Sequence, residues 1–115
     1  MSETQIQQAL RIALGDEPDL VWWRTSTGLT EECNPNDGSS RALRYGLAVG
    51  SADLVGILRP GRFFALEVKT AKGRVRPKQE TWLALVRRMG GFAAVVRSVD
   101  EAKAALTRAR NGESE

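Results

Sequence analysis

Two apolar segments separated by a short turn most strongly constrain how this chain can fold. Residues 54–58 and 63–68 are rich in Leu, Val, Ile, Phe and Ala, and the sequence Arg-Pro-Gly-Arg at 59–62 separates them. This pattern predicts two antiparallel strands, over residues 53–58 and 63–70, joined as a hairpin. Pro-Gly favours a type II turn, which fits a loop of three to five residues better than a loop of two. We therefore predict a loop of at least three residues.

Hydrophobic spacing and end signals predict the elements around this hairpin. Three segments place apolar residues at helical spacing, and the first and last of them begin with a capping-box pattern. The predicted helices cover residues 3–14, 77–89 and 99–109, and further strands are predicted over residues 20–25 and 92–97. Residues 26–40, rich in Gly, Asn, Asp, Ser and Thr, predict a loop, and residues 41–49 predict a short strand or an ordered loop.

The order of these elements predicts an α/β fold. A strand, a helix and a strand follow one another after residue 63, which implies a parallel strand pair with a right-handed crossover. With the antiparallel hairpin this gives a mixed β-sheet flanked by helices, in the order α-β-(β)-β-β-α-β-α. The length of 115 residues suits one compact domain over residues 1–115, with residues 111–115 as a frayed tail.

Membrane and secretion signals are not found in the sequence. No apolar run approaches the roughly 20 residues that cross a bilayer. The first ten residues are polar where a signal peptide would have a basic patch and an apolar core. We therefore expect a cytoplasmic protein.

The absence of histidine limits the chemistry that this chain can perform. Ser-His-Asp and Cys-His schemes are excluded, and so are metal sites that depend on imidazole. The single cysteine, Cys33, cannot form an intramolecular disulfide and is interpreted as a loop thiol with no role. Acid–base and metal chemistry must therefore come from carboxylates, lysine and water, a set that suits Mg²⁺, with Mn²⁺ as its usual substitute.

Positive charge is concentrated in the central part of the sequence. Residues 41–98 carry twelve Lys and Arg against three acids, a net +9, whereas residues 1–40 carry two against seven, a net −5. A segment this basic is typical of a protein that binds a polyanion, with nucleic acid as the usual partner. The alternative is a solvated basic face without a partner.

The second strand of the hairpin carries two charged residues on one face. Side chains alternate along a strand, so Glu67 and Lys69 share a face with Phe63 and Ala65. Glu-x-Lys alone is usually a salt bridge at a strand end. A loop of three residues, however, places Asp53 opposite Glu67 or Lys69, on their face, whereas a two-residue loop turns Asp53 away. Two carboxylates this close repel each other unless a cation lies between them or one is protonated.

This arrangement predicts a metal-dependent hydrolytic site. Asp53, Glu67 and the backbone carbonyl of Val68 would hold the metal, and Lys69 would orient or deprotonate the attacking water and offset negative charge in the transition state. Gln79 would hydrogen-bond water or backbone near the site, with a plain surface glutamine as the alternative. Basic residues just after the strand are suited to contacts with a phosphate backbone: Lys72, Arg74, Arg76 and Lys78.

The residues in this order resemble the PD-(D/E)XK nuclease signature, and the wider pattern resembles its virus-type replication-repair nuclease (VRR-NUC) branch. The matching segments are Glu3 before Ile6-Gln7, then RYGLAVGSADLVGI, FFALEVKTAKGRVRPKQETWL and GGFAAVVRSVDEA. The resemblance implies a restriction-endonuclease-like core and Mg²⁺- or Mn²⁺-dependent phosphodiester hydrolysis. It also implies that Glu3 can join the metal site and that Gln79 belongs to the motif set. The P in the name PD-(D/E)XK stands for a proline before the aspartate, and this chain has Ala52 there instead. The side chain at this position takes no part in the chemistry.

Three functions remain open at this point. The first is a structure-selective DNA endonuclease of phage or bacterial type, acting as a homodimer on branched DNA such as four-way junctions. The second is a DNA-binding module with a nuclease fold and no turnover. The third is a basic structural protein in which Glu67 and Lys69 form only a salt bridge. Trp22 and Trp23 are candidates for a dimer interface, with core packing as the alternative.

Overall fold

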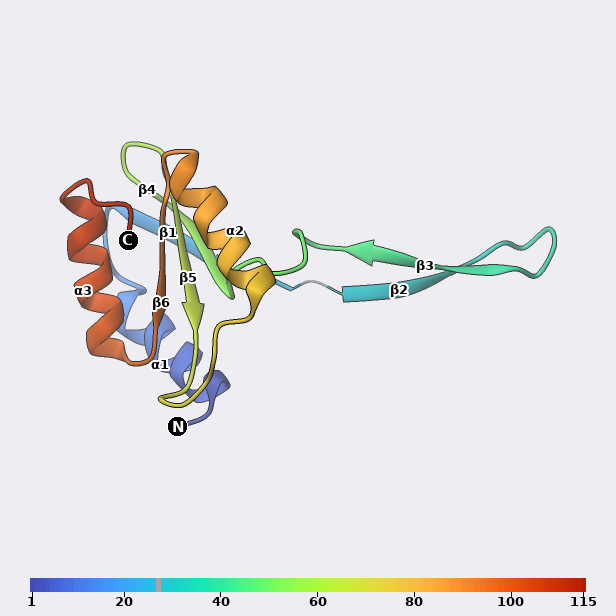
Figure 1. Cartoon of the computed structure of the whole chain (residues 1–115), viewed down its shortest axis with the longest axis horizontal. Coiled ribbons are helices and arrows are strands. Elements are labelled where there is room, and N and C mark those ends of the chain that lie inside the picture. The colour runs from blue at the N-terminus through green and yellow to red at the C-terminus, as the bar shows by residue number, and fades with distance from the viewer. Residues whose placement is uncertain (27) are drawn as a thin grey trace.

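The protein consists of an α/β body and a long hairpin arm that extends from it (Figure 1). The structure, a computed structural model, describes residues 1–26 and 28–115. Its elements in chain order are α1 (Glu3–Leu14), β1 (Leu20–Arg24), β2 (Gly28–Cys33), β3 (Ser40–Tyr45), β4 (Leu54–Leu58), β5 (Arg62–Val68), α2 (Pro77–Arg88), β6 (Phe92–Val96) and α3 (Val99–Arg110). None of these helices is long and apolar enough to cross a membrane.

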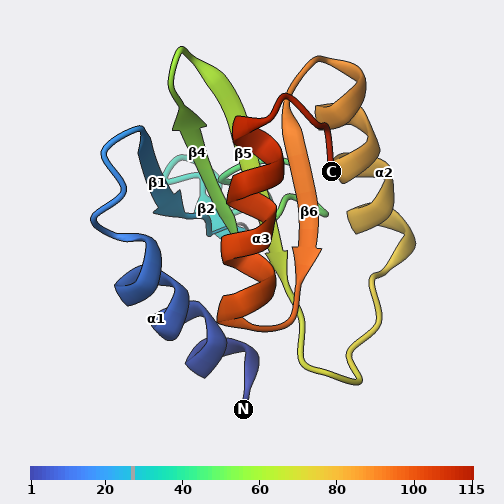
Figure 2. The same ribbon diagram turned by 90° about the vertical axis from the view of Figure 1, so that its left-hand side faces the viewer.

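Four strands form one mixed sheet in the order β1-β4-β5-β6. β4 pairs antiparallel with β1 and β5, whereas β5 and β6 are parallel and are joined through α2. Helices α1 and α3 lie on one face of the sheet and α2 on the other (Figure 2). The predicted α/β class, the mixed sheet with flanking helices and the β5–α2–β6 crossover are therefore confirmed, and they match a restriction-endonuclease-like core.

Side-chain alternation along the sheet separates two apolar clusters. On the α1/α3 face, Phe64, Leu66 and Val68 are buried in the main core, and Phe64 stacks on Phe92 with ring centroids 5.4 Å apart. On the α2 face, Ala65 packs in a smaller cluster that includes Leu83. The predicted division of this strand into two faces is confirmed.

The loop of the β4–β5 hairpin has three residues, as predicted. Leu58 pairs with Arg62, which leaves residues 59–61 in the loop. Continuing the same register past the pair Leu54–Leu66 by one step places Asp53 opposite Glu67. The predicted type II turn centred on Pro60-Gly61 is not formed, because the N–H of Gly61 donates to the carbonyl of Leu58 at 2.9 Å and so centres the turn on Arg59 and Pro60. The length of the loop nevertheless determines which residues meet at the far end of the hairpin.

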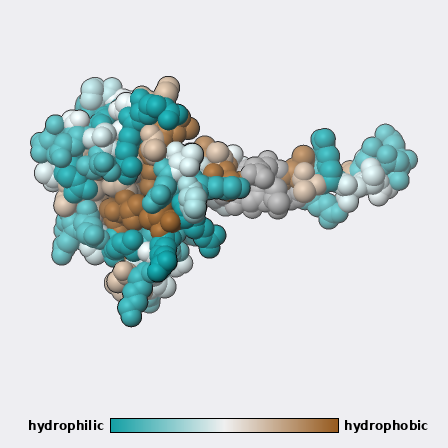
Figure 3. All heavy atoms as spheres, in the orientation of Figure 1, coloured by the Kyte–Doolittle hydropathy of each residue, from teal (hydrophilic) through white to brown (hydrophobic). Residues whose placement is uncertain are grey.

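The arm corrects the prediction of a loop over residues 26–40. β2 and β3 form an antiparallel hairpin of their own, a two-stranded sheet separate from the body. Residue 27 lies outside the described part of the chain. The far end of the arm is hydrophilic (Figure 3), and Glu32 forms a 2.5 Å ion pair with Arg41 across it. A strand pair that packs on no core needs no hydrophobic alternation, which is why the sequence pattern did not reveal it.

The chain after α3 is held against the body. It contains neither helix nor strand and its residues are exposed, in keeping with a tail. However, the backbone N–H of Ala93 on β6 donates to the carbonyl of Ser114 at 3.0 Å, and Arg87 lies 3.3 Å from Glu115. These contacts do not fit the expectation that residues 111–115 are frayed.

Candidate active site

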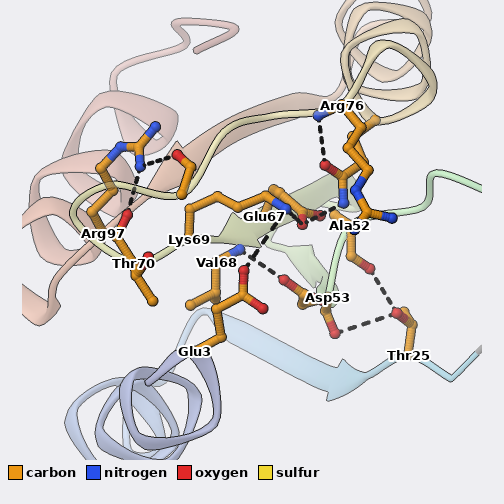
Figure 4. Close-up of polar contacts among 12 residues, drawn as sticks. Glu3, Thr25, Ala52, Asp53, Glu67, Val68, Lys69, Thr70, Arg76 and Arg97 are labelled. Carbon is orange, nitrogen blue, oxygen red and sulfur yellow. Dashed lines mark hydrogen bonds and ion pairs between the residues drawn. The ribbon is translucent and has the colours of Figure 1, made fainter. Parts of the chain in front are cut away.

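Asp53 is held at the start of β4 by contacts with the two neighbouring strands (Figure 4). One of its carboxylate oxygens accepts the backbone N–H of Val68 at 2.9 Å. The backbone N–H of Thr25 donates to the carbonyl of Asp53 at 2.8 Å, and the Thr25 hydroxyl donates to the carbonyl of Ala52 at 2.6 Å. Among the described residues the second carboxylate oxygen of Asp53 has no hydrogen-bond donor, and the negative charge of Asp53 acts on the neighbouring Glu67.

Glu67 is the most deeply buried charged residue in the described part of the chain, with 2% of its surface exposed. Its Oε1 accepts a hydrogen bond from the side-chain amide of Gln79 at 3.0 Å. Its Oε2 is buried and has no protein donor among the described residues. Burial, reinforced by the negative charge of Asp53, raises the pKa of Glu67 to about 8.

Lys69 completes the group on the same strand face. It is 7% exposed, and its ammonium nitrogen lies 3.6 Å from Glu67 Oε1 and 3.8 Å from Glu3 Oε1. Glu3 lies in the first turn of α1, which the side chain of Ser2 caps. The structure thus brings together residues from α1, β4 and β5 that the sequence predicted for one site. The carboxylate of Glu3 is half-exposed and lies beside Lys69.

Gln79 connects the site to the first turn of α2. Its amide oxygen accepts the backbone N–H of Arg76 at 2.9 Å while its amide nitrogen donates to Glu67, so its orientation is fixed from both ends. The start of α2 is in turn fixed by Gly50, which precedes β4 and has a φ of +92°. A Cβ at Gly50 would lie 2.4 Å from the carbonyl oxygen of Lys78, so only glycine allows this close approach.

Replacing Gly50 with alanine is expected to lower cleavage activity by about tenfold or more, because a small displacement of a positioning group has effects of this size. The added methyl must push the start of α2, and Gln79 with it, away from Glu67. Steady-state DNA cleavage measures the effect, and circular dichroism monitors folding. Gly38→Ala is the matched control, since this arm glycine also has a positive φ but no atom within 4 Å of the added Cβ. Equal activity of Gly50→Ala and Gly38→Ala would contradict the positioning role.

The predicted basic residues lie on the loop that joins β5 to α2 and on the first turn of that helix. Lys72, Arg74, Arg76 and Lys78 are all exposed. Arg97, at the end of β6, donates to the carbonyls of Thr70 and Gly73 on this loop, both at 2.6 Å, and so fixes its path.

Several residues of the site were not predicted. Thr25, Gly50 and Arg97 act through contacts with the backbone of segments far away in the sequence. Of the three, only Arg97 was marked in the sequence, as a charged residue at the end of a predicted apolar strand. Gln7, already part of the segment that resembles the family, lies one turn after Glu3 on α1. It is 8% exposed, and its amide oxygen is buried without a hydrogen-bond partner among the described residues.

The donors at this site fit a divalent cation. The unpartnered Glu67 Oε2 and the second oxygen of Asp53 are two hard oxygen donors. The N–H of Val68 points toward Asp53, and in an extended strand the carbonyl of the same residue points to the same side, which adds a third oxygen. In the described ranges there is no cluster of three or more His, Cys, Asp or Glu residues, so water would have to complete the coordination.

Comparison with known proteins agrees with this geometry. A model of the VRR-NUC domain family matches residues 1–100, a range that includes every predicted site residue. No curated protein matches the sequence. The family implies a nuclease-type function in DNA processing, and the helix-flanked mixed sheet is the fold expected for it. A match over most of the chain, together with Asp53, Glu67 and Lys69 at the end of the β4–β5 hairpin, shows that the protein belongs to the VRR-NUC family.

Proposed function

We propose that this protein is a divalent-metal-dependent deoxyribonuclease that hydrolyses phosphodiester bonds. The observation that carries the proposal is the buried carboxylate of Glu67, which lies next to Asp53, contacts Lys69 and Gln79 through one oxygen, and has no protein donor to the other among the described residues. Holding two carboxylates together in a buried place costs free energy. Protonation of Glu67, whose pKa is raised to about 8, relieves this cost without a metal, and a cation that displaces the proton relieves it as well. This supports a site built for Mg²⁺ or Mn²⁺ rather than a structural salt bridge.

Asp53, Glu67 and the carbonyl of Val68 would hold the metal. When bound, the metal lowers the pKa of a water molecule and polarises the scissile phosphate. Gln79 keeps the Glu67 carboxylate oriented from α2. Glu3, which lies on the Lys69 side of the pair, would join the metal site through a bound water.

Lys69 would act directly on the reacting groups. Its ammonium group lies next to the carboxylate pair and is shielded from solvent, with 9% of its side chain exposed. From there it can orient or deprotonate the attacking water and donate to the phosphate oxygens as negative charge grows on them. A charge in such a desolvated place acts more strongly than one on the surface.

The basic loop would bind the DNA backbone on either side of the cut. Lys72, Arg74, Arg76 and Lys78 are exposed and follow the strand that carries Glu67 and Lys69. Contacts of lysine and arginine with phosphates add affinity without sequence preference. This agrees with a nuclease that selects DNA by shape, and we propose branched DNA such as four-way junctions, cut endonucleolytically by a homodimer. The cytoplasm of a bacterium or a phage-infected cell is the proposed location.

The alternative function is a DNA-binding module with a nuclease fold and no turnover. It would use the same basic loop, but it would give no reason for keeping two carboxylates together in a buried place. For this reason we favour the enzyme.

A cleavage panel tests the proposal. The protein is incubated with labelled linear duplex, flap and four-way-junction DNA in the presence of Mg²⁺, Mn²⁺ or EDTA. We expect cutting with either metal and none with EDTA, with junction or flap DNA cut faster than linear duplex. Equal rates on all three DNAs would refute the preference for branched DNA. Binding of DNA without cutting under any metal condition would support the binding module instead.

A further inference from the structure

A hollow of about 480 Å³ lies where α1 meets β1, the strand at one edge of the sheet. It is lined by Arg11, in the last turn of α1, and by Arg24, the last residue of β1. The half-buried Trp22 forms part of its wall and packs against the main core. Among the residues that the structure describes, no acidic side chain lines this space, which we call the α1–β1 hollow.

The two arginines of the α1–β1 hollow hold no other part of the protein in place. Both are exposed, and neither makes an ion pair or a side-chain hydrogen bond with the described residues. Other arginines of the body do connect segments, since Arg62, Arg97 and Arg110 donate to backbone carbonyls or carboxylates. A guanidinium group carries five N–H donors in a planar fork that matches the oxygens of a phosphate. Arg11 and Arg24 therefore suit a ligand that carries phosphates.

The acidic residues nearest in the sequence do not cancel this positive charge. They lie on the turn between α1 and β1, where Glu17 and Asp19 pair with Arg110 of α3 at 2.7 and 2.6 Å. Asp16 is the third acid of that turn and is exposed. Two arginines thus face one unengaged carboxylate, which leaves the hollow positive and favours an anionic ligand.

The α1–β1 hollow begins one residue away from the active site. Arg24 directly precedes Thr25, whose backbone N–H and hydroxyl donate to the carbonyls of Asp53 and Ala52. Side chains alternate along β1, and the buried Leu20 lies in the main core, so Arg24 shares the α1/α3 face of the sheet with it. The hollow therefore adjoins the start of β4 on the side away from α2.

A row of polar side chains on α1 connects the active site to the hollow. Glu3, beside Lys69, is followed at intervals of one helical turn by Gln7 and Arg11. The buried amide oxygen of Gln7 has no hydrogen-bond partner among the described residues. No contact holds this oxygen in place, so the amide can turn toward a ligand that lies along the row. The row gives a polar path from the metal-binding carboxylates to the two arginines.

The hollow and the basic loop lie on different sides of the active site. Figure 2 shows the loop after β5, in yellow, and the part of the body formed by α1 and β1, in blue, on opposite sides of β4 and β5. The arms of a branched DNA leave the branch point in different directions, so a protein that recognises the branch needs phosphate-binding groups on more than one side of the cut. Such contacts fix the orientation of the DNA without reading its sequence.

We propose that the α1–β1 hollow binds the phosphate backbone of a second arm of branched DNA through Arg11 and Arg24, while the basic loop binds the arm that is cut. This inference rests on the proposed nuclease function and names the groups that select the branched substrate. Linear duplex has no second arm, so the two arginines add affinity for branched DNA alone, which is a difference of affinities and hence a specificity.

Fluorescence anisotropy in EDTA, with labelled four-way-junction DNA at several salt concentrations, tests the inference. Arg11→Gln and Arg24→Gln should each lower the slope of log affinity against log salt by about one, because each removes one phosphate contact. The double variant should bind the junction about tenfold more weakly or worse. Lys103→Gln is the matched control, since it removes one charge from an exposed position on α3 and should leave both quantities unchanged. Arg24→Lys, which keeps the charge, should recover most of the affinity.

Linear duplex and a cleavage assay with Mg²⁺ separate this inference from the proposed function. All variants should bind linear duplex equally well. Arginine variants that bind the junction as tightly as Lys103→Gln, or that lose as much affinity for linear duplex as for the junction, would overturn the inference. If either result occurs while the wild-type protein cuts DNA, the nuclease function stands without the second-arm site. If only junction binding falls and the wild-type protein never cuts, the second-arm site stands and the nuclease is refuted.

Discussion

Replacing Lys69 with methionine is expected to slow metal-dependent DNA cleavage by about 10²–10⁴-fold, the usual contribution of a general acid–base or charge-stabilising group. Methionine keeps most of the apolar stem and removes the ammonium group that lies 3.6 Å from Glu67. Single-turnover cleavage of a labelled DNA substrate measures the rate, and fluorescence anisotropy measures DNA affinity. Affinity should change far less than the rate, because the exposed basic loop makes the backbone contacts.

Lys103→Met is the matched control for this prediction. Lys103 is an exposed residue of α3, away from the site, so this variant loses the same charge and should keep the wild-type rate. If the Lys69→Met protein cuts DNA as fast as the Lys103→Met protein, Lys69 takes no part in the reaction. A variant that binds DNA much more weakly, yet cuts normally once saturated, would reassign Lys69 to substrate binding.

Replacing Glu67 with glutamine is expected to stabilise the metal-free protein at pH 8.5. The pKa of Glu67 is about 8 in the folded protein against 4.5 as its ordinary value, so the folded state binds the extra proton between these pH values. The free energy of unfolding therefore falls as pH rises from about 4.5 to about 8, since each unit by which the two pKa values differ is worth about 1.4 kcal/mol. Glutamine is neutral at every pH, so the variant should lose this slope.

Thermal unfolding in EDTA at several pH values measures this effect. Near pH 5 the two proteins should unfold at similar temperatures, and at pH 8.5 the Glu67→Gln protein should be more stable by about 2–4 kcal/mol. Adding Mn²⁺ should stabilise the wild-type protein more at pH 8.5 than at pH 5, because the cation binds the charged carboxylate. Parallel pH profiles of the two proteins would show that Glu67 is not held in a strained, buried pair.

The hairpin was predictable because local rules determine it. A run of apolar residues defines β5, and Pro60-Gly61 favours a loop of three to five residues. With three loop residues, the register that pairs Asp53 with Glu67 follows from neighbouring residues alone. The same rules predicted α1, α2 and α3 to within one or two residues at their ends. In each helix the signal is burial of one face, which hydrophobic periodicity records.

Two kinds of feature were not predictable from the sequence: those that depend on long-range backbone contacts, and those that bury few side chains. Most of the arm residues whose burial is described are exposed, so β2 carries no hydrophobic pattern and was predicted as a loop. Arg97 reaches the carbonyls of Thr70 and Gly73 only because β6 lies parallel to β5. Gly50 is required by the approach of α2, a helix that begins more than twenty residues later. Glu3 was placed near the site by family resemblance, and its contact with Lys69 requires the packing of α1.

We expect Asp53 and Glu67 together to bind a divalent cation, and calorimetric titration of Mn²⁺ into wild-type and Asp53→Asn protein measures this binding. Asparagine keeps the shape of Asp53 and its contact with the N–H of Val68 but removes the charge that the cation needs. We expect saturable binding to the wild-type protein at neutral pH and a loss of affinity of more than about tenfold in the variant. Equal binding to both proteins, or no binding to a folded wild-type protein, would contradict it.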